Sequence, residues 1–164
     1  MRRRCIPAWF GWRRRRGTRF APREGMKIAQ WMKHPVITMK PADSTRHARE
    51  IMEKRRINQL PVLVNGRLVG IVTDRDLRDA FPSLFDALEP GGRGPAVTDP
   101  SAIPIEDVMT AKVLTLTSDA SVGEGARLMR RERIGALPIV EAGRLVGILT
   151  RSDVLDAFAA ASRG

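Results

Sequence analysis

The sequence holds little of what disulfide-bonded, metal-binding or membrane-spanning proteins require. Cys5 is the single cysteine, so neither an internal disulfide nor a cage of thiolate metal ligands can form. The only histidines, His34 and His47, do not suggest a metal site, and we predict no metal ligands. No apolar run approaches the roughly 18 residues of a transmembrane helix. With 43% hydrophobic residues in 164, we expect a soluble, cytoplasmic globular protein.

The excess of positive charge lies mainly in the first 25 residues. The chain has a net charge of +11, of which residues 1–25, with nine arginines and one acid, carry +8. Arginine runs mixed with tryptophan and phenylalanine could hold nucleic acid or lie on an anionic membrane surface. The alternatives are a disordered solvated extension, or a start codon assigned too early, since Met26 begins the repeated part. We favour these plainer alternatives.

The rest of the chain consists of two similar units. Residues 31–81 align without a gap with residues 108–158, with 20 identities in 51 positions. We therefore divide the chain into a first repeat at 26–81, a linker at 82–102 with a possible short helix at 83–89, and a second repeat at 103–161. Each unit is small for a core of its own, so we expect the two to pack as a pseudo-twofold pair through their sheets.

Both repeats show the element order β-α-β-β-α, which predicts an α/β fold. In the second repeat, Ser121 and Glu124 have the capping-box spacing that begins a helix. Asn65-Gly66 is a strong hairpin signal, and the corresponding Ala142-Gly143 is a weaker one. The expected bounds are lead-in helices at Ile28–Lys33 and Ile105–Met109, first strands at Val36–Met39 and Val113–Leu116, hairpin strands at Leu60–Val64 and Arg67–Thr73, and closing helices at Asp74–Phe81 and Arg151–Ala160.

The main candidate binding motifs stand where a strand meets a closing helix, at Thr73-x-x-Asp76 and Thr150-x-x-Asp153. An aspartate can accept both hydroxyls of a ribose, and a threonine hydroxyl with the first N–H groups of a helix can donate to phosphate. Arg75 and Arg151 lie in the same motifs and could add cationic contacts. The same spacing also caps helices, and from spacing alone we favour capping.

An adenine ring would need an apolar slot with backbone hydrogen bonds at its edge. Candidates stand on the first strands and just before the hairpin prolines. They are Ile37-Thr38 and Leu114-Thr115, with the segments Asn58–Pro61 and Gly135–Pro138. Of these, the residues predicted to bind are Thr38, Pro61, Thr115, Gly135, Ala136 and Pro138. For the apolar members of this group, we favour a role in the core over a role in an adenine site. No arrangement of nucleophile, base and orienting group is present, so no catalytic residue is predicted and we do not expect an enzyme.

Three duplicated motifs resemble those of the cystathionine-β-synthase (CBS) domain pair, or Bateman module. They are WM-x-x-x-V-x-T (Trp31–Thr38), M-x-x-x-x-I-x-x-L-P-V (Met52–Val62) and G-R-L-V-G-I-V-T-D-R-D (Gly66–Asp76), and each has a counterpart 77 residues later. The resemblance covers about residues 26–161. It implies packed three-stranded sheets, two clefts between the repeats that bind adenosine-containing ligands, and disc-like dimers.

The resemblance implies a free-standing regulatory or sensor module that changes conformation or partner binding with its ligand. It makes a nucleotide site the favoured interpretation of both T-x-x-D motifs. The expected ligand is AMP, ADP or ATP, ahead of NAD or S-adenosylmethionine, with no required cofactor, and a homodimer and an unidentified protein partner are expected. The alternatives are a nucleic-acid-binding protein that uses the tail, or a ligand-free dimerisation module.

The sequence also predicts that the two clefts differ. Asp74 offsets Arg75 in the first motif, whereas Arg151 stands beside neutral Ser152 in the second. Gly135-Ala136, taken with the second motif, leaves more room for adenine than Asn58-Gln59. On this basis Asp153→Ala is expected to weaken nucleotide binding more than Asp76→Ala.

Overall fold

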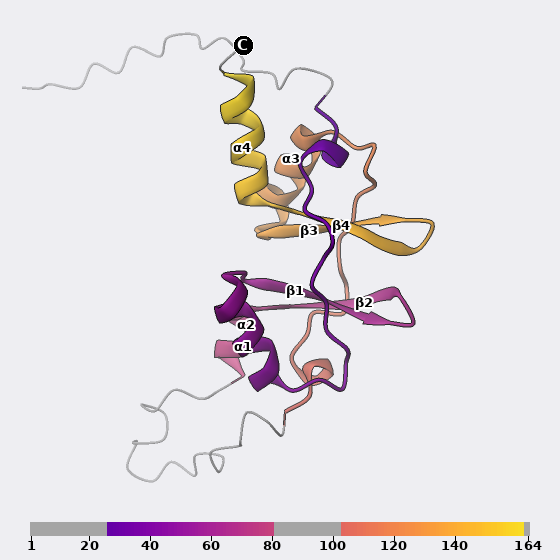
Figure 1. Ribbon diagram of the computed structural model, residues 1–164, viewed down its shortest axis with the longest axis vertical. Helices are drawn as coiled ribbons and strands as arrows, with labels where there is room; N and C mark the ends of the chain where they lie inside the picture. The colour runs from indigo at the N-terminus through magenta and orange to yellow at the C-terminus, as the bar shows by residue number, and fades with distance from the viewer. Residues whose placement is uncertain (1–25, 81–102, 163–164) are drawn as a thin grey trace, which may run out of the picture.

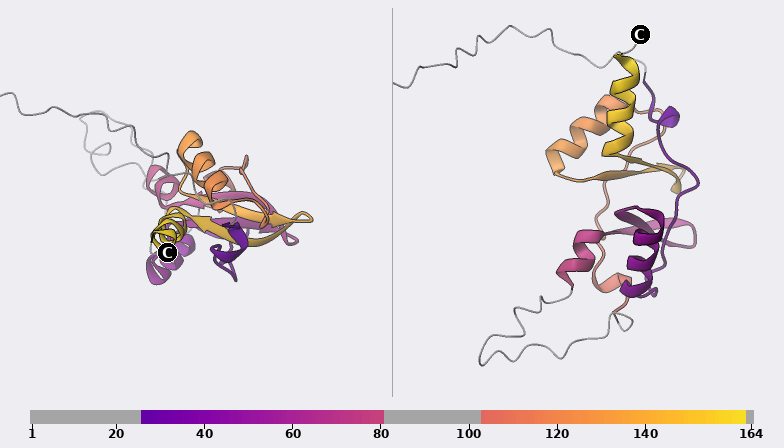
Figure 2. Two further views of the ribbon diagram at one scale, coloured as in Figure 1. Left: turned by 90° about the horizontal axis from the view of Figure 1, so that it is seen from above. Right: turned by 60° about the vertical axis from the view of Figure 1, so that its left-hand side comes forward.

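The computed structural model describes residues 26–80 and 103–162. The arginine-rich tail at 1–25 and the linker with its possible helix at 83–89 lie outside the described residues. Figures 1 and 2 show two β-hairpins facing each other at the centre of the molecule, with the helices of each repeat on the outer face of its own hairpin. The strands β2 (Arg67–Thr73) and β4 (Arg144–Thr150) are in contact between the layers. The predicted α/β pair, packed through its sheets, is confirmed.

The helices and hairpins lie close to their predicted positions. Each hairpin is antiparallel, with Leu60 opposite Val72 and Leu137 opposite Leu149. The elements of the first repeat are η1 (Ile28–Gln30), α1 (Thr45–Arg55), β1 (Gln59–Val64), β2 (Arg67–Thr73) and α2 (Asp74–Asp79). Those of the second repeat are η3 (Ile105–Asp107), α3 (Val122–Glu132), β3 (Ala136–Glu141), β4 (Arg144–Thr150) and α4 (Arg151–Ala161).

The outer helices begin and end through local signals. The hydroxyl of Ser44 accepts from the His47 N–H at 3.2 Å at the start of α1, and Ser121 accepts from Glu124 at 3.1 Å at the start of α3. The Ser121 cap is therefore present as predicted. Both helices end at an arginine in the left-handed conformation, Arg56 with φ of 54° and Arg133 with φ of 58°.

The predicted first strands at 36–39 and 113–116 are wrong as strands. Each touches its hairpin through one parallel bridge, Met39 with Val62 and Leu116 with Ile139. The reason is that the chain changes repeats here: Lys33 still pairs with Ile148 of the second repeat, six residues before Met39 pairs with the first. Because these residues connect one repeat to the other, only the last of them pairs with its hairpin, and no continuous strand forms. Each sheet is therefore a two-stranded hairpin with one bridged residue at its edge.

The two lead-in segments are exchanged between the repeats, as Figure 1 shows for η1 beside α3 and η3 beside α1. The Ile28 N–H donates to Ala120 O at 2.9 Å, and the Ile28 side chain lies in the core of the second repeat with Leu137 and Leu149. Ile105 lies in the core of the first repeat, and its N–H donates to Asp43 O at 2.8 Å. Each core is thus completed by the other repeat.

The hairpin turns give a first testable prediction. Asn65 and Gly66 adopt φ of 51° and 78°, and Ala142 and Gly143 adopt φ of 46° and 78°. Alanine is strained in this conformation, whereas asparagine tolerates it. We expect Ala142→Asn to raise the free energy of unfolding by about 0.5–1 kcal/mol, measured by urea denaturation. The control, Asn65→Ala, should lower it by a similar amount, and a loss of stability in Ala142→Asn would contradict the explanation.

Candidate functional site

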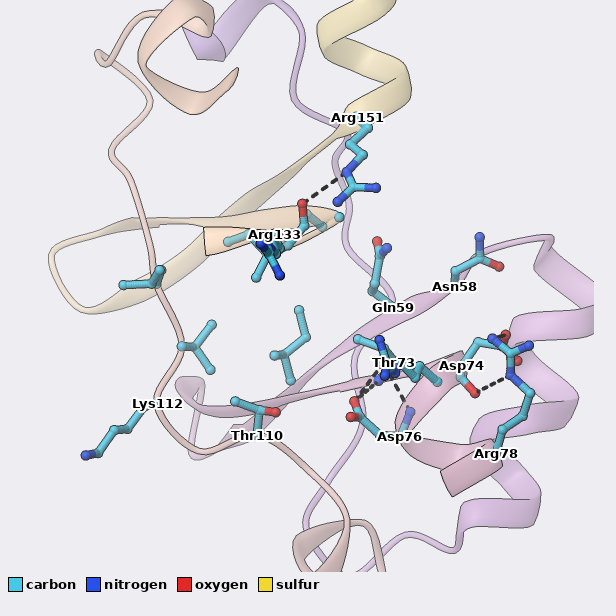
Figure 3. A pocket seen from close by; sticks show the side chains of 17 residues that line it. Asn58, Gln59, Thr73, Asp74, Asp76, Arg78, Thr110, Lys112, Arg133 and Arg151 are labelled. Atoms are coloured by element: carbon cyan, nitrogen blue, oxygen red, sulfur yellow. Dashed lines mark hydrogen bonds and ion pairs between the residues drawn. The ribbon is translucent and has the colours of Figure 1, made fainter. Parts of the chain in front are cut away.

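A cleft of about 440 Å³ opens between the repeats at the start of α2, and we call it cleft 1. Its walls come from both repeats, since the Thr73–Asp76 motif of the first faces two segments of the second (Figure 3). Its lining residues are Asn58, Gln59, Ile71, Thr73, Asp74, Arg75, Asp76, Arg78, Thr110, Lys112, Val113, Leu114, Arg133, Ile134, Gly135, Ala136 and Arg151.

Thr73 and Asp76 form a complete capping box at the mouth of cleft 1. Asp76 Oδ2 accepts from the Thr73 N–H at 2.7 Å and from Thr73 Oγ1 at 2.7 Å, and Thr73 Oγ1 accepts from the Asp76 N–H at 3.2 Å. Asp76 Oδ1 makes no hydrogen bond or ion pair with another described residue, and Asp76 is only partly buried. The motif is therefore a cap whose second carboxylate oxygen still faces the cleft.

Cleft 1 is rich in cations, two of which are neutralised within the first repeat. Arg78 Nη2 lies 2.9 Å from Asp74 Oδ2, and Arg75 Nε lies 3.5 Å from Asp79 Oδ2. Arg151 Nε donates to the Ile134 carbonyl at 3.1 Å. Lys112 and Arg133 make no ion pair with any acid in the described part of the chain. These two cations come from the second repeat, opposite Asp76.

A second cleft, cleft 2, has a volume of about 430 Å³ and is related to cleft 1 by the repeat. It is lined by Lys33, Pro35, Val36, Ile37, Arg56, Ile57, Asn58, Gln59, Gly135, Ile148, Thr150, Arg151 and Ser152. Three of these described residues are cations and none is an acid. The two clefts therefore differ in chemistry as well as in sequence.

Asp153 does not line cleft 2, although it is the counterpart of Asp76. Its Oδ2 accepts from the Thr150 N–H at 2.7 Å and from Thr150 Oγ1 at 2.6 Å, so the same capping box is present. Its Oδ1 lies 3.3 Å from Lys33 Nζ, and its side chain is 5% exposed. Asp153 is thus a buried carboxylate with both oxygens engaged.

The clefts meet at one place in the centre of the molecule. Four residues line both: Asn58, Gln59, Gly135 and Arg151. A methyl group on Gly135 would lie 2.7 Å from Gln59 Nε2, so these two residues pack closely between the clefts. The absence of a side chain at Gly135 therefore lets Gln59 fill this position.

The predicted site residues divide into four groups. Thr73, Arg75, Asp76 and Ala136 line cleft 1, Thr150 lines cleft 2, and Gly135 and Arg151 line both. Five others line neither cleft, namely Thr38, Pro61, Thr115, Pro138 and Asp153. The two prolines are fully buried because they lie inside the hairpins, where Met39 N–H donates to Pro61 O and Leu116 N–H to Pro138 O. Ile37 and Leu114, which precede Thr38 and Thr115 and were considered with them, line cleft 2 and cleft 1 respectively.

The structure also groups the segments differently from the sequence prediction. Ala136 lies with Thr73 and Asp76 in cleft 1, not with the second motif, because each cleft takes its T-x-x-D motif from one repeat and its facing loops from the other. Residues missed by the sequence analysis are Lys33, Thr110, Lys112 and Arg133. Arg133 had a signal, since it and Arg56 are identical at equivalent positions of the repeat.

Two further properties bear on the kind of site. Within residues 26–80 and 103–162, no group of three or more histidine, cysteine or acidic side chains is placed to hold a metal ion. No helix in the same ranges is long and apolar enough to cross a membrane. The clefts are therefore the features from which a function can be argued.

The protein is a module of two repeats that exchange their lead-in segments and form two clefts between them. Comparisons with known proteins identify its family. The sequence model of the CBS domain matches residues 28–83 and 105–160. The chain therefore belongs to the CBS domain family. A CBS domain-containing protein of Dictyostelium discoideum is 34% identical over 131 residues, which are 79% of this chain and 88% of that protein.

Solved structures agree with this assignment. The crystal structure of CBSX2, an Arabidopsis thaliana CBS-pair protein, in complex with AMP superposes with a TM-score of 0.69 at 28% identity and covers 85% of this chain and all of that one. The CBS domain pair of protein MJ0100, in complex with 5′-methylthioadenosine and S-adenosylmethionine, gives 0.68 at 29% identity, covering 83% of this chain and 98% of that one.

The family also includes proteins much longer than this chain. The inosine-5′-monophosphate dehydrogenase of Korarchaeum cryptofilum is 34% identical over 120 residues, but the match covers 73% of this chain and 21% of that enzyme. A 33.4 kDa protein of Thermofilum pendens is matched over 43% of its length. The chain thus spans less than half of these two relatives.

Proposed function

We propose that this protein is a regulatory module that binds an adenine nucleotide in cleft 1. The observation that carries the proposal is the position of Asp76 Oδ1, which faces a cleft with cations on its opposite wall. Family structures with AMP, and with 5′-methylthioadenosine and S-adenosylmethionine, support an adenosine-containing ligand.

The ribose is assigned to Asp76. Asp76 Oδ2 is held by Thr73, which fixes the orientation of the carboxylate and leaves Oδ1 to accept from a sugar hydroxyl. Because the Thr73 hydroxyl proton is already donated to Asp76, Thr73 is assigned to positioning and not to phosphate binding.

The adenine and the phosphate are assigned to the second repeat. Leu114 is 41% exposed although it is a large apolar residue, and together with Val113 and Ile134 it gives cleft 1 an apolar wall suited to a flat ring. Arg133 and Lys112 supply positive charge without an acidic partner among the described residues. The phosphate of AMP, ADP or ATP would lie toward these cations.

The regulatory part of the proposal follows from the two-repeat construction of cleft 1. The ribose carboxylate belongs to the first repeat, whereas Leu114 and Arg133 belong to the second. A ligand that contacts both repeats stabilises one of their relative arrangements over others, and a partner that reads that arrangement is then controlled by the ligand. A homodimer, the protein partner and the cytoplasmic location stay predictions.

Calorimetric titration of the full chain tests this function. We expect AMP, ADP or ATP to bind and to raise the melting temperature, since a ligand at 100 times its Kd stabilises the folded state by about 2.7 kcal/mol. NAD and S-adenosylmethionine form the second set of ligands, and inorganic phosphate is the control for a bare anion. If no adenosine-containing ligand produces heat or a melting shift, the alternative of a ligand-free dimerisation module is favoured.

A further inference from the structure

Clefts 1 and 2 differ at one position that faces their aspartates. Lys33 and Thr110 are equivalent in the repeat, and each pairs its backbone with the strand that leads into the opposite T-x-x-D motif. Lys33 N–H donates to Ile148 O at 2.9 Å, and Thr110 N–H donates to Ile71 O at 2.9 Å. The two side chains therefore start from the same place relative to Asp153 and Asp76.

Of these two side chains, only that of Lys33 forms an ion pair with the aspartate it faces. Lys33 Nζ lies 3.3 Å from Asp153 Oδ1, and the Asp153 side chain is sheltered from water. Figure 3 shows the opposite case, with Thr110 and Asp76 both on the wall of cleft 1 and dashed lines joining Asp76 to Thr73 alone. The carboxylate oxygen that a ribose would use is thus paired with Lys33 beside cleft 2, whereas its counterpart on Asp76 has no ion pair with a described residue in cleft 1.

A ribose in cleft 2 would have to displace an ammonium group from a buried carboxylate. Breaking this ion pair leaves a buried carboxylate with only neutral sugar hydroxyls in place of a cation, although the exposed Lys33 ammonium regains solvent. In cleft 1 Asp76 forms no ion pair with a described residue, so the same hydroxyls break none there. The cost of binding a nucleoside therefore differs between two otherwise similar clefts.

We propose that Lys33 closes cleft 2 to nucleosides and that Thr110 keeps cleft 1 open, so that each chain binds one adenine nucleotide. This inference deepens the proposed function and rests on it. Lys33 acts as a specificity-determining residue through its ion pair with Asp153. The order of the two clefts is the reverse of the one predicted from the motifs alone.

Exchanging the two residues tests the proposal by stoichiometry. In calorimetric titrations of the full chain with AMP, we expect one site for the wild type and two for Lys33→Thr. Thr110→Lys should weaken the wild-type site at least tenfold, because the new ammonium group can pair with Asp76. The double exchange should again show one site, now lost on Asp153→Ala and kept on Asp76→Ala.

Lys27→Thr is the matched control, since Lys27 pairs with exposed Asp119 and lines neither cleft. It should bind AMP as the wild type does, and melting curves show that each variant is folded. Two sites in the wild type, or a single site in Lys33→Thr, would overturn the role of Lys33 while leaving the proposed function intact. Absence of binding by every variant and the wild type would overturn the proposed function and this inference together.

Discussion

Replacing Ile28 with alanine is expected to lower the free energy of unfolding by about 2–5 kcal/mol. Ile28 is 0% exposed and lies in a core cluster with Val122, Leu137 and Leu149 of the second repeat. Removing its side chain leaves a cavity because these neighbours belong to a helix and a hairpin that cannot collapse onto it. Although Ile28 lies in a 3-10 helix of only three residues, its replacement is therefore expected to reduce the stability strongly.

Urea denaturation measures this loss of free energy of unfolding, and an unchanged m-value shows that the variant differs from the wild type in stability alone. Ile105→Ala is the symmetric test, because Ile105 is equally buried in the core of the first repeat. Leu155→Ala is the control: Leu155 is 68% exposed on α4, so the change should stay within about 0.5 kcal/mol. A loss below 1 kcal/mol for both isoleucines, by the same scale, would show that the lead-in segments are not exchanged.

Asp76→Ala is expected to weaken AMP binding by about 10- to 100-fold, the value of a hydrogen bond to a charged group. It should cost only about 1 kcal/mol of stability, because the change removes the Asp76 half of the capping box and keeps the Thr73 cap. The reason is that Asp76 is partly exposed and has one carboxylate oxygen directed to cleft 1. Calorimetric titration and urea denaturation of the same preparation give both numbers.

Asp153→Ala is the paired measurement and should show the opposite pattern. AMP affinity should stay close to that of the wild type, because Asp153 lines neither cleft. Stability should fall by about 2–3 kcal/mol, since the change removes the Asp153 half of the capping box and leaves the partly buried N–H and hydroxyl of Thr150 without their acceptor. Equal losses of affinity in the two variants would contradict the assignment of the ribose to Asp76.

Arg151 connects these two results, because it lines both clefts and stands where the first repeat has Asp74. In the sequence this difference favoured phosphate binding at the second motif. In the structure the Arg151 side chain is held by the Ile134 carbonyl between the clefts, so its charge is shared by both. The position of Arg151 in the sequence therefore could not show which cleft its charge serves.

The sequence by itself determined the features that depend on neighbouring residues or on the duplication. The hairpin at Asn65-Gly66, the cap at Ser121 and the closing helices follow from local signals, and the 77-residue repeat with its motifs indicated the family. The T-x-x-D motifs were correctly recognised as caps, because the capping geometry spans only three residues, and their role in a nucleotide site stays a prediction.

Only the tertiary structure decided which repeat each segment serves. Ile28 completes a core built from residues about 90 or more positions later, and no local pattern specifies that exchange. The same exchange brings Ala136 to Asp76 and Lys33 to Asp153, across 60 and 120 positions of the chain. An ion pair at such a separation leaves no trace in spacing or periodicity. It forms because two segments cross at one edge of a hairpin, and that crossing distinguishes the open carboxylate from the occupied one.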